Sequence, residues 1–358
     1  MSARSFAKIY RGTPRNIRLL SRALLKGDVV AVPTETVYGL AGDALNTEAV
    51  KKIFRAKGRP TNDPLIVHIH SLAQLDQLAE RNAAVEKLAR AFWPGPLTLI
   101  LPKKPVVPGL VTSGRPSVAV RMPRHPLFRS LLRACGRPLA APSANPFGYI
   151  SPTTAAHVRD GLGQKIRYIL DGGTCDIGVE STILDLRDPG HPAILRPGAI
   201  ERRAIERVLR VNVTAAHGEK TKTTTAAVAP GLLARHYSPR TPIELHDQLS
   251  KTLAVGACLQ AMPHKNRLQA GSYKKAASST EAFLYFRRPT AYAKGRTPKN
   301  IHWLTIAGEL PAAAKALFAT LRELDAGNWK KIHAERAPGG SALALAINDR
   351  LTRAAAKR

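Results

Sequence analysis

The order of the apolar segments constrains what this chain can fold into more than any other feature. Up to about residue 209, short apolar runs of strand length alternate with longer segments that have helical periodicity. Some of the runs follow one another too closely for a parallel crossover, so the alternation predicts an α/β layer with a mixed sheet. The expected strands are 29–33, 65–70, 97–102, 117–123, 138–144, 167–171, 181–186 and 193–196, and the expected helices are 14–26, 47–57, 72–92, 126–135 and 153–162.

The alternation fails between residues 210 and 240. This stretch begins with a low-complexity run of Thr, Lys and Ala and ends in a denser motif, Arg235-His236-Tyr237. A second α/β pattern follows, with no Gly-x-Gly-x-x-Gly after its strands, so a dinucleotide site is not indicated. Its expected strands are 243–246, 282–286 and 301–306, and its expected helices are 310–324 and 341–356. We therefore expect a first domain over 1–209, a linker over 210–240 and a smaller second domain over 241–358.

The charge and composition bound the possible partners. A net charge of +30 is compatible with a polyanion partner, and it is equally compatible with a source organism whose proteins are generally basic. The low content of aromatic residues, 5%, argues against binding of single-stranded nucleic acid by base stacking. The scattered Cys135, Cys175 and Cys258 indicate reduced thiols, not a disulfide framework or a zinc site. No apolar run reaches the roughly 18 residues that a membrane helix needs. We expect a cytoplasmic protein without a membrane partner.

Two short segments place paired polar side chains on one face of the backbone. In Lys57-Gly58-Arg59 and in Ser143-Ala144-Asn145, polar residues stand at i and i+2, and such residues project to the same side of an extended chain. One pair is cationic and the other combines a hydroxyl with an amide, which suits the binding of a polyphosphate. Other polar residues at the ends of expected strands add cations and neutral donors but few acids, which is typical of an anion pocket: Thr34, Thr36, His68, Arg121, Ser181, Thr182 and Arg196.

Each of these residues has an ordinary structural interpretation when it is taken alone. His68 would be a hydrogen-bonded strand histidine, and Lys57 with Arg59 would be a solvated helix end. Arg121 interrupts an apolar strand, and a buried arginine must be paired or bound to a ligand. The sequence contains no Gly-x-x-x-x-Gly-Lys-Ser/Thr, His-Glu-x-x-His or Gly-x-Ser-x-Gly motif and no carboxylate cluster, so no protein-held metal is expected. The hypothesis of an anion pocket depends on the combination.

The combination resembles the YrdC-type threonylcarbamoyl-adenylate synthase family in its longer, two-domain form. The resemblance runs through nearly all of the chain. It implies a twisted mixed-sheet YrdC-like domain with flanking helices, followed by a linker and a smaller Rossmann-like α/β domain. The further motifs that carry it are Pro33-Thr34-Glu35-Thr36-Val37-Tyr38-Gly39-Leu40, Pro64-Leu65-Ile66-Val67-His68, Trp93-Pro94-Gly95-Pro96-Leu97-Thr98, Val118-Ala119-Val120-Arg121, Asp171-Gly172-Gly173, Val179-Glu180-Ser181-Thr182-Ile183, Leu195-Arg196-Pro197-Gly198, Arg235-His236-Tyr237 and Ala346-Ile347-Asn348-Asp349-Arg350-Leu351.

By this resemblance, the chain joins L-threonine, bicarbonate and ATP into threonylcarbamoyl-adenylate and pyrophosphate, with Mg²⁺ held mostly by the phosphates. The product would serve N6-threonylcarbamoyladenosine modification of tRNA through downstream threonylcarbamoyl-transferase proteins. The resemblance assigns threonine to Thr36, His68, Arg121, Ala141 and Ser181. It assigns ATP to Lys57, Arg59, Asp63, Ser117, Ser143, Ser151, Arg196 and Tyr237. It assigns the chemical step to Lys57, Arg59, Ser143 and Asn145.

Two positions depart from the family pattern. Asn62-Asp63 reverses the usual Asp-Asn order, which would bring the carboxylate of Asp63 toward ATP unless the loop shifts. Ala234 stands where the family has a tyrosine two residues before the histidine, so the contact of that tyrosine with the nucleotide is expected to be lost or to pass to Tyr237.

Two other functions stay open from the sequence. A non-catalytic RNA-binding protein on the same fold is favoured by the net charge and disfavoured by the complete set of threonine-binding residues. Carbamoyl transfer in hydrogenase maturation uses a related domain, but the acylphosphatase-like and zinc-finger segments of such proteins are absent. We further expect residues 210–240 to fold over the pocket as a lid that keeps water from a labile carbamate.

Overall fold

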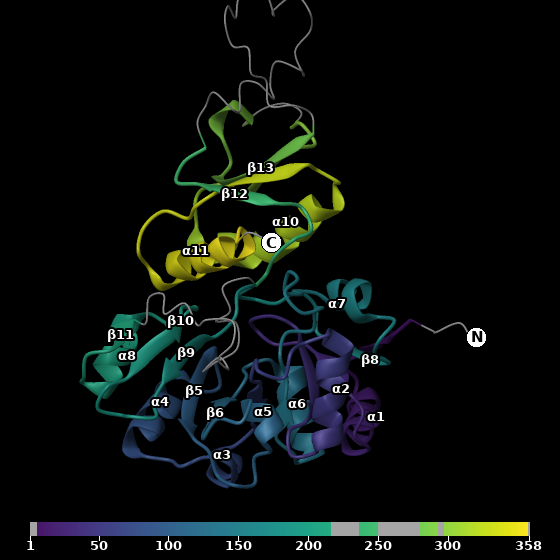
Figure 1. Ribbon diagram of the computed structural model, residues 1–358, viewed down its shortest axis with the longest axis vertical. Coiled ribbons are helices and arrows are strands. Elements are labelled where there is room, and N and C mark those ends of the chain that lie inside the picture. Colours follow the sequence, from purple (N-terminus) through teal and green to yellow (C-terminus); the bar gives the residue numbers. More distant parts are fainter. Residues whose placement is uncertain (1–5, 216–235, 250–279, 293–296, 357–358) are drawn as a thin grey trace, which may run out of the picture.

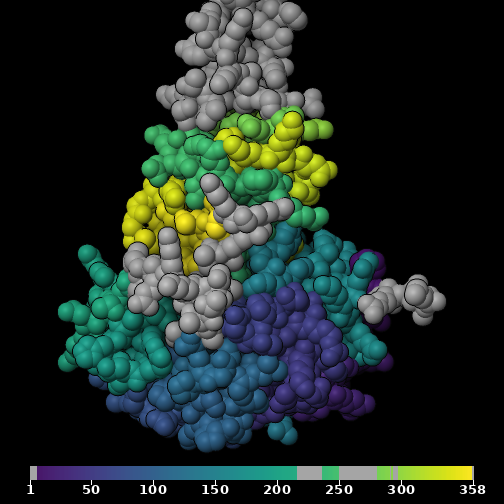
Figure 2. Space-filling model, viewed as in Figure 1, coloured from purple at the N-terminus to yellow at the C-terminus, as the bar shows by residue number. Residues whose placement is uncertain are grey.

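The structure is a computed structural model that describes residues 6–215, 236–249, 280–292 and 297–356. These residues form two α/β units (Figure 1). The first unit holds a large sheet with flanking helices, and the second unit lies against it through the helices α10 (Leu310–Ala326) and α11 (Ala342–Ala354). In the face that Figure 2 shows, green and yellow atoms of the second unit adjoin teal atoms of the first.

The first unit is built on an eleven-stranded mixed sheet. Its strand order is β1-β8-β2-β3-β7-β4-β6-β5-β9-β10-β11, and both parallel and antiparallel pairs occur in it. The expected mixed sheet is therefore confirmed. The strands are β1 (Lys8–Arg11), β2 (Val30–Val32), β3 (Gly39–Asp43), β4 (Ile66–His68), β5 (Leu97–Pro102), β6 (Ser117–Arg121), β7 (Leu139–Ala140), β8 (Tyr168–Asp171), β9 (Thr182–Asp185), β10 (Ala193–Arg196) and β11 (Thr214–Ala215).

Local signals explain where the helices of the first unit begin and end. The Thr13 hydroxyl accepts a hydrogen bond from the amide of Asn16 (3.3 Å) and caps α1, while Gly58, at φ 63°, ends α2 in the left-handed conformation. The helices are α1 (Pro14–Leu25), α2 (Thr47–Lys57), α3 (Leu72–Leu78), α4 (Ala83–Phe92), α5 (Gly109–Thr112), α6 (Pro126–Cys135), α7 (Ala155–Leu162) and α8 (Arg202–Leu209).

The single helix expected over residues 72–92 is wrong. The chain breaks at Ala79, which forms a β-bridge with Lys103, and a new helix begins after Asn82. The side chain of Asn82 accepts a hydrogen bond from the amide of Val85 (3.0 Å), which is the N-cap geometry that starts α4. The apolar periodicity continues through the break because both helices bury the same side of the layer.

The second unit is a four-stranded parallel sheet with helices on one face. Its strand order is β12-β15-β13-β14, and every pair is parallel. The strands are β12 (Ile243–His246), β13 (Glu281–Arg287), β14 (Ile301–Thr305) and β15 (Lys331–Glu335), and a short 3₁₀ turn spans Thr290–Tyr292. The sequence did not predict β15, because Lys331-Ile332-His333-Ala334-Glu335 lacks a continuous apolar run. The smaller α/β fold of this unit is confirmed.

The two units share one hydrophobic core. Val37, Ile150 and Val179 of the first unit belong to the same buried cluster as Phe318 and Leu321 of α10. Gly178, at φ 81°, lies so close to α10 that a Cβ there would stand 2.5 Å from the carbonyl oxygen of Ala314. The units are therefore docked at the level of their backbones.

The domain boundaries at residues 209 and 240 stay predictions. Most of the segment between them, 216–235, lies outside the described residues. Among the described residues, no helix has both the length and the apolar character needed to cross a bilayer.

Candidate functional site

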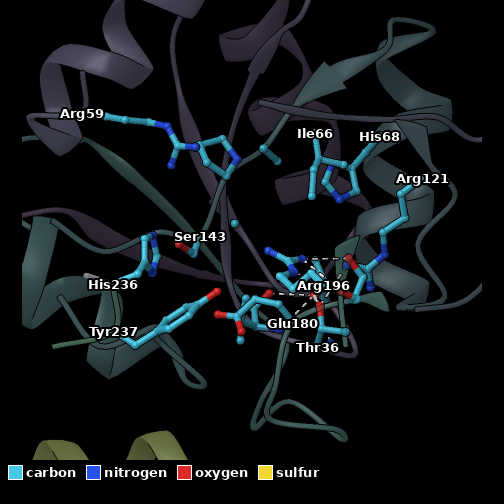
Figure 3. Close-up of a pocket in the computed structure, with 16 residues that line it drawn as sticks. Thr36, Arg59, Ile66, His68, Arg121, Ser143, Glu180, Arg196, His236 and Tyr237 are labelled. Atoms are coloured by element: carbon cyan, nitrogen blue, oxygen red, sulfur yellow. Dashed lines mark hydrogen bonds between the residues drawn. The ribbon is translucent and has the colours of Figure 1, made fainter. Parts of the chain in front are cut away.

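A polar pocket lies where several strands of the first unit end. In Figure 3 the side chains of Ile66 and His68 (β4), Arg121 (β6) and Arg196 (β10) surround the same space as His236 and Tyr237, which belong to the end of the expected linker. Nine of the residues that the sequence assigned to substrates line it: Thr36, Arg59, His68, Arg121, Ala141, Ser143, Ser181, Arg196 and Tyr237. The other lining residues are Thr34, Val37, Gly39, Ile66, Pro142, Glu180 and His236.

Strand pairing explains how distant residues meet here. β4 and β6 are parallel neighbours, and their register sets His68 directly beside Arg121 at the carboxyl ends of the two strands. Parallel strands bring their carboxyl ends to one edge of a sheet, so side chains at these positions converge. The sequence placed both residues at strand ends, but their adjacency depends on a pairing that it does not encode locally.

Arg121 is buried and is held by an acid that the sequence analysis did not place in the site. Its Nη2 lies 2.8 Å from Oε1 of Glu35, and its Nη1 donates to the Thr36 hydroxyl (3.0 Å). Its Nε donates to the carbonyl of Gly95 (3.2 Å). Glu35 is 1% exposed, and although burial raises the pKa of its carboxyl, Arg121 lowers that pKa below the usual value overall. Glu35 therefore stays ionised and fixes the guanidinium.

Ser181 and Arg196 are joined further along the same sheet, where β5, whose Thr98 is paired with Arg121, lies between β6 and β9. Nη2 of Arg196 donates to the carbonyl (3.1 Å) and to the hydroxyl (3.1 Å) of Ser181. The Ser181 hydroxyl also lies 2.8 Å from the hydroxyl of Thr98. The residue assigned to threonine and the residue assigned to ATP thus form one hydrogen-bonded unit, which would place the two substrates side by side.

Lys57 and Asn145 do not line the pocket, although the family resemblance assigned both to the chemical step. The Lys57 ammonium donates to the carbonyls of Ser143 (2.5 Å) and Asn145 (2.6 Å), so it holds the segment that carries Ser143. The Asn145 amide donates to the carbonyls of Pro146 (3.0 Å) and Tyr149 (2.7 Å). Both side chains turn away because these buried carbonyls need donors. The two segments singled out in the sequence contact each other, and Ser143 alone of its pair faces the pocket.

Asp63 is paired with Arg59 and does not line the pocket. Its Oδ2 lies 2.9 Å from Nη2 of Arg59, and both side chains are almost fully buried. Arg59 also donates to the carbonyls of Asp63 (3.0 Å) and Pro64 (2.8 Å). The carboxylate therefore supports a pocket-lining arginine from behind, because a buried charge requires a partner.

Two serines assigned to ATP also lie outside the lining. Ser117 is at the start of β6, and Arg121 is at the end of that strand that reaches the pocket. The Ser151 hydroxyl donates to Oε1 of Glu180 (2.6 Å). Ser151 thus touches a pocket residue without being part of the wall, and contacts of these serines with ATP stay predictions.

His236 and Tyr237 bring the linker end into the pocket. Their rings lie 4.1 Å apart and Phe147 packs edge-on against His236 at 6.2 Å. The Tyr237 hydroxyl points toward Glu180 in Figure 3 and, although it is buried, has no hydrogen-bond partner among the residues that the structure describes. An unpaired buried hydroxyl at this place is ready for a ligand. The expected lid includes residues 216–235, which lie outside the described residues, so closure of a lid stays a prediction.

Three charged or titratable residues of this region were missed as site residues: Glu180 and His236, which line the pocket, and Glu35, which supports Arg121. Glu180 is the one acid among the described residues that line the pocket, so the lining agrees with the expectation of few acids, and each of the two glutamates is paired with an arginine. Their signal in the sequence was weak, because each stands beside an assigned residue, Thr36 or Ser181, inside a motif that was interpreted through its neighbour.

The pocket and its surroundings keep an excess of positive charge. The buried carboxylates there are Glu35, Asp63 and Glu180, and the buried cations are Lys57, Arg59, Arg121, Arg196 and Arg350. The carboxylates are engaged by Arg121, Arg59 and Arg350 respectively. Among the described pocket residues, no carboxylate is left over to hold a metal ion, whereas an anion would find several guanidinium groups.

A group of potential metal ligands lies outside this pocket. Glu244, His246 and His333 bring a carboxylate and two imidazoles together on the second sheet. Nε2 of His246 and Nδ1 of His333 are 3.0 Å apart, and Glu244 forms an ion pair with Lys331 (2.8 Å). The described contacts satisfy these groups without an ion.

The burial of His68 makes a prediction about acid stability. Burial, and then the charge of Arg121, lower the pKa of His68 to about 3. The unfolded chain, with a pKa of about 6.5, therefore takes up a proton before the folded chain does, and the free energy of unfolding falls as the pH drops from 6.5 toward 3. Between pH 7 and pH 5 this group should remove roughly 2 kcal/mol of stability.

The measurement is urea unfolding of wild type and His68→Gln at pH 7 and pH 5. The variant should lose less stability on acidification than wild type, with His191→Gln, at an exposed histidine, as the control. Equal losses in wild type and His68→Gln would contradict a neutral buried His68.

Comparisons with known proteins cover nearly the whole chain. A Sua5/YciO/YrdC family profile, described as telomere recombination, matches residues 22–198. A profile for the C-terminal domain of threonylcarbamoyl-AMP synthase matches residues 200–356. The two matched regions meet within two residues of each other, and the second includes α8 and β11 of the first unit as well as the whole second unit.

Curated relatives and a solved structure agree. The threonylcarbamoyl-AMP synthase of Pyrococcus abyssi is 49% identical over 227 residues, which are 62% of this chain and 65% of that protein. The threonylcarbamoyl-AMP synthase of Bacillus subtilis is 40% identical over 342 residues, 94% of this chain and 91% of that protein. The crystal structure of P. abyssi Sua5 complexed with L-threonine matches with a TM-score of 0.82 at 35% identity over 98% of both chains.

Proposed function

The chain belongs to the two-domain family of threonylcarbamoyl-AMP synthases, and on that premise we propose that it joins L-threonine, bicarbonate and ATP into threonylcarbamoyl-AMP and pyrophosphate. It is an adenylate-forming enzyme of the nucleotidyltransferase type. The observation that carries the proposal is one buried pocket that is lined both by Arg121, held by Glu35, and by the hydrogen-bonded pair Ser181–Arg196. This arrangement offers separate anion partners for an amino acid and a nucleotide within a single enclosure.

Threonine binds at the Arg121 side of the pocket. The guanidinium of Arg121 is buried and orientated by Glu35, and its planar fork suits the carboxylate of an amino acid. Thr36, His68 and Ser181 provide hydroxyl and imidazole groups around it. His68 acts in its neutral form, because its lowered pKa keeps a second positive charge away from the threonine ammonium group.

ATP binds at the Arg59 and Arg196 side. The threonine ammonium group first releases a proton to solvent, and the free amine and bicarbonate give a carbamate and water; a carbamate oxygen then attacks the α-phosphorus. The bond from that phosphorus to the bridging oxygen breaks, and pyrophosphate leaves with the electron pair. Buried guanidinium groups and the Ser143 hydroxyl stabilise the charge that builds on the phosphoryl oxygens, and no covalent enzyme intermediate is required. Tyr237 offers its unpaired hydroxyl to the nucleotide.

Magnesium enters this scheme as part of the Mg–ATP substrate. The pocket carboxylates are engaged by arginines, so the phosphate oxygens would be the main ligands of the ion. Modification of tRNA through downstream transferase proteins, a weak contact of the basic surface with RNA and a cytoplasmic location belong to the same proposal. Nothing in the described residues favours the non-catalytic RNA-binding alternative.

The test is mass spectrometry of the purified full-length protein incubated with Mg–ATP, L-threonine and bicarbonate. We expect threonylcarbamoyl-AMP and an equal amount of pyrophosphate, and both should disappear when threonine or bicarbonate is omitted. L-Valine, which replaces the hydroxyl by a methyl group of similar shape, is the matched control substrate. Pyrophosphate release that does not depend on threonine would overturn the proposal.

A further inference from the structure

We propose that the second unit completes the pocket, and that Arg350 of α11 is a positioning residue that clamps the two segments carrying Ser181 and Arg196. The inference rests on the proposed function, because it deepens the account of the same site. The second unit would then contribute to catalysis, a role that neither its fold nor the family membership assigns to it.

Arg350 reaches across from the second unit with its whole guanidinium. Its Nε lies 3.0 Å from Oε2 of Glu180, its Nη1 donates to the carbonyl of Pro197 (2.6 Å), and its Nη2 donates to the carbonyl of Glu180 (3.4 Å). The side chain is fully buried. Three donors of one rigid planar group thus fix Glu180 and Pro197 relative to each other.

The two clamped positions directly adjoin substrate-binding residues. Glu180 precedes Ser181, and Pro197 follows Arg196, while Arg196 and Ser181 are hydrogen-bonded to each other. The segments touch at the backbone as well, since a Cβ on Gly198 would lie 2.3 Å from the amide nitrogen of Thr182. A shift between Glu180 and Pro197 would therefore displace the Ser181–Arg196 pair itself.

Glu180 transmits the position of Arg350 to the pocket wall. One carboxylate oxygen receives Arg350 and the other receives the Ser151 hydroxyl, so the side chain is held from both sides while it lines the pocket. The second unit also supports Tyr237, whose ring lies 5.6 Å from the Arg350 guanidinium carbon and stacks on Phe318 of α10 at 5.5 Å. Glu180, the Ser181–Arg196 pair and Tyr237 are thus all held in place by side chains of α10 and α11.

A simpler possibility is that Arg350 only docks the two units. Arg322 of α10 provides the matched comparison, because it also crosses the boundary: it donates to the carbonyls of Ile150 and Ser151. Its bonds go to the backbone, and its loss removes a docking contact while the bond of Arg350 to the Glu180 carboxylate remains.

The experiment uses the full chain as wild type, as the single variants Arg350→Met, Glu180→Gln and Arg322→Met, and as the double variants Arg350→Met/Glu180→Gln and Arg322→Met/Glu180→Gln. Steady-state kinetics are measured at a temperature well below every melting point, together with threonine binding by calorimetry. We expect Arg350→Met to lower kcat/KM at least about tenfold, since a clamp acts through its partners. In Arg350→Met/Glu180→Gln, the second substitution should add little further loss of kcat/KM. It should restore part of the melting temperature, because the Glu180 carboxylate that Arg350→Met leaves unpaired is gone.

Arg322→Met should lower the melting temperature. In Arg322→Met/Glu180→Gln the loss of kcat/KM should equal the product of the two single losses, because the two residues act independently. Two results would refute the clamp and leave Arg350 with a docking role only. One is an Arg350→Met variant that folds and keeps wild-type kinetics. The other is a double variant Arg350→Met/Glu180→Gln whose loss of kcat/KM equals the product of the two single losses. Should Arg350→Met fail to fold, Arg350→Lys keeps the charge but lacks the fork, and an undiminished kcat/KM in it would refute the clamp equally. If wild type makes no product, the proposed function fails. The threonine affinities of wild type, Arg350→Met, Glu180→Gln and Arg350→Met/Glu180→Gln then still test the clamp.

Discussion

Arg121→Ala is expected to weaken threonine binding by about 2–5 kcal/mol, or roughly 30-fold to several thousand-fold, because the threonine carboxylate loses its buried guanidinium partner. The charge left behind within the protein is Glu35, which is 1% exposed and has its Oε1 2.8 Å from Arg121. The variant should therefore lose stability as well as affinity, and the two losses have different causes. Calorimetric titration of threonine gives the affinity, and thermal unfolding gives the stability.

The double variant Arg121→Ala/Glu35→Gln separates the two causes. It removes the stranded carboxylate, so the melting temperature should recover in part, but the threonine carboxylate still has no partner and the affinity should not recover. Arg124→Ala is the matched control, because its side chain is exposed although its backbone amide donates to Glu35 (3.2 Å). Recovery of threonine affinity in the double variant would show that Arg121 only neutralises Glu35.

Arg59→Ala is expected to destabilise the fold by about 3–5 kcal/mol, because it strands a buried carboxylate. Asp63 is fully buried, and its carboxylate lies 2.9 Å from Arg59. Arg59 also lines the pocket, so turnover should fall for a second reason, the loss of a positive charge beside the phosphates. Urea unfolding measures the first effect, and the rate of pyrophosphate release under saturating substrates measures the second.

Asp63→Asn, alone and combined with Arg59→Ala, tells the two effects apart. The combination should regain much of the stability while kcat stays low. Asp63→Asn alone should keep Arg59 in the pocket and lower kcat much less than Arg59→Ala does, since the Asp63 side chain does not line the pocket. A kcat in the combined variant close to that of wild type would contradict a direct role for Arg59 in the chemistry.

The parts of the fold that the sequence predicted correctly are those with local signals. Residues 47–57 and 126–135 were expected as helices and appear with those bounds, because a glycine in the left-handed conformation ends each of them. β3 was missed because Gly39-Leu40-Ala41-Gly42-Asp43 is rich in small residues and lacks the β-branched side chains that mark a strand. Its strand conformation depends on its neighbours β2 and β7.

The site shows the same division between local and long-range information. Strand-end polar residues such as His68 and Arg121 could be selected from the sequence, because position in a strand is a local property. The direction of Lys57 could not, since it depends on carbonyls of Ser143 and Asn145 more than 80 residues away. The acids Glu35 and Glu180 were missed for a related reason: which arginine neutralises which acid depends on how the strands and the two units pack.

The ion pair between Glu180 and Arg350 can form only late in the synthesis of the chain. Its partners are 170 residues apart, so at about 5–20 residues per second a ribosome needs roughly 10–30 s to deliver Arg350 after Glu180 has been made. Throughout that interval Glu180 lacks the ion-pair partner that it has in the complete chain. The last wall of the pocket can therefore settle only when α11 arrives, and a ribosome that stalls before this helix leaves a chain whose large sheet can form but whose active site cannot.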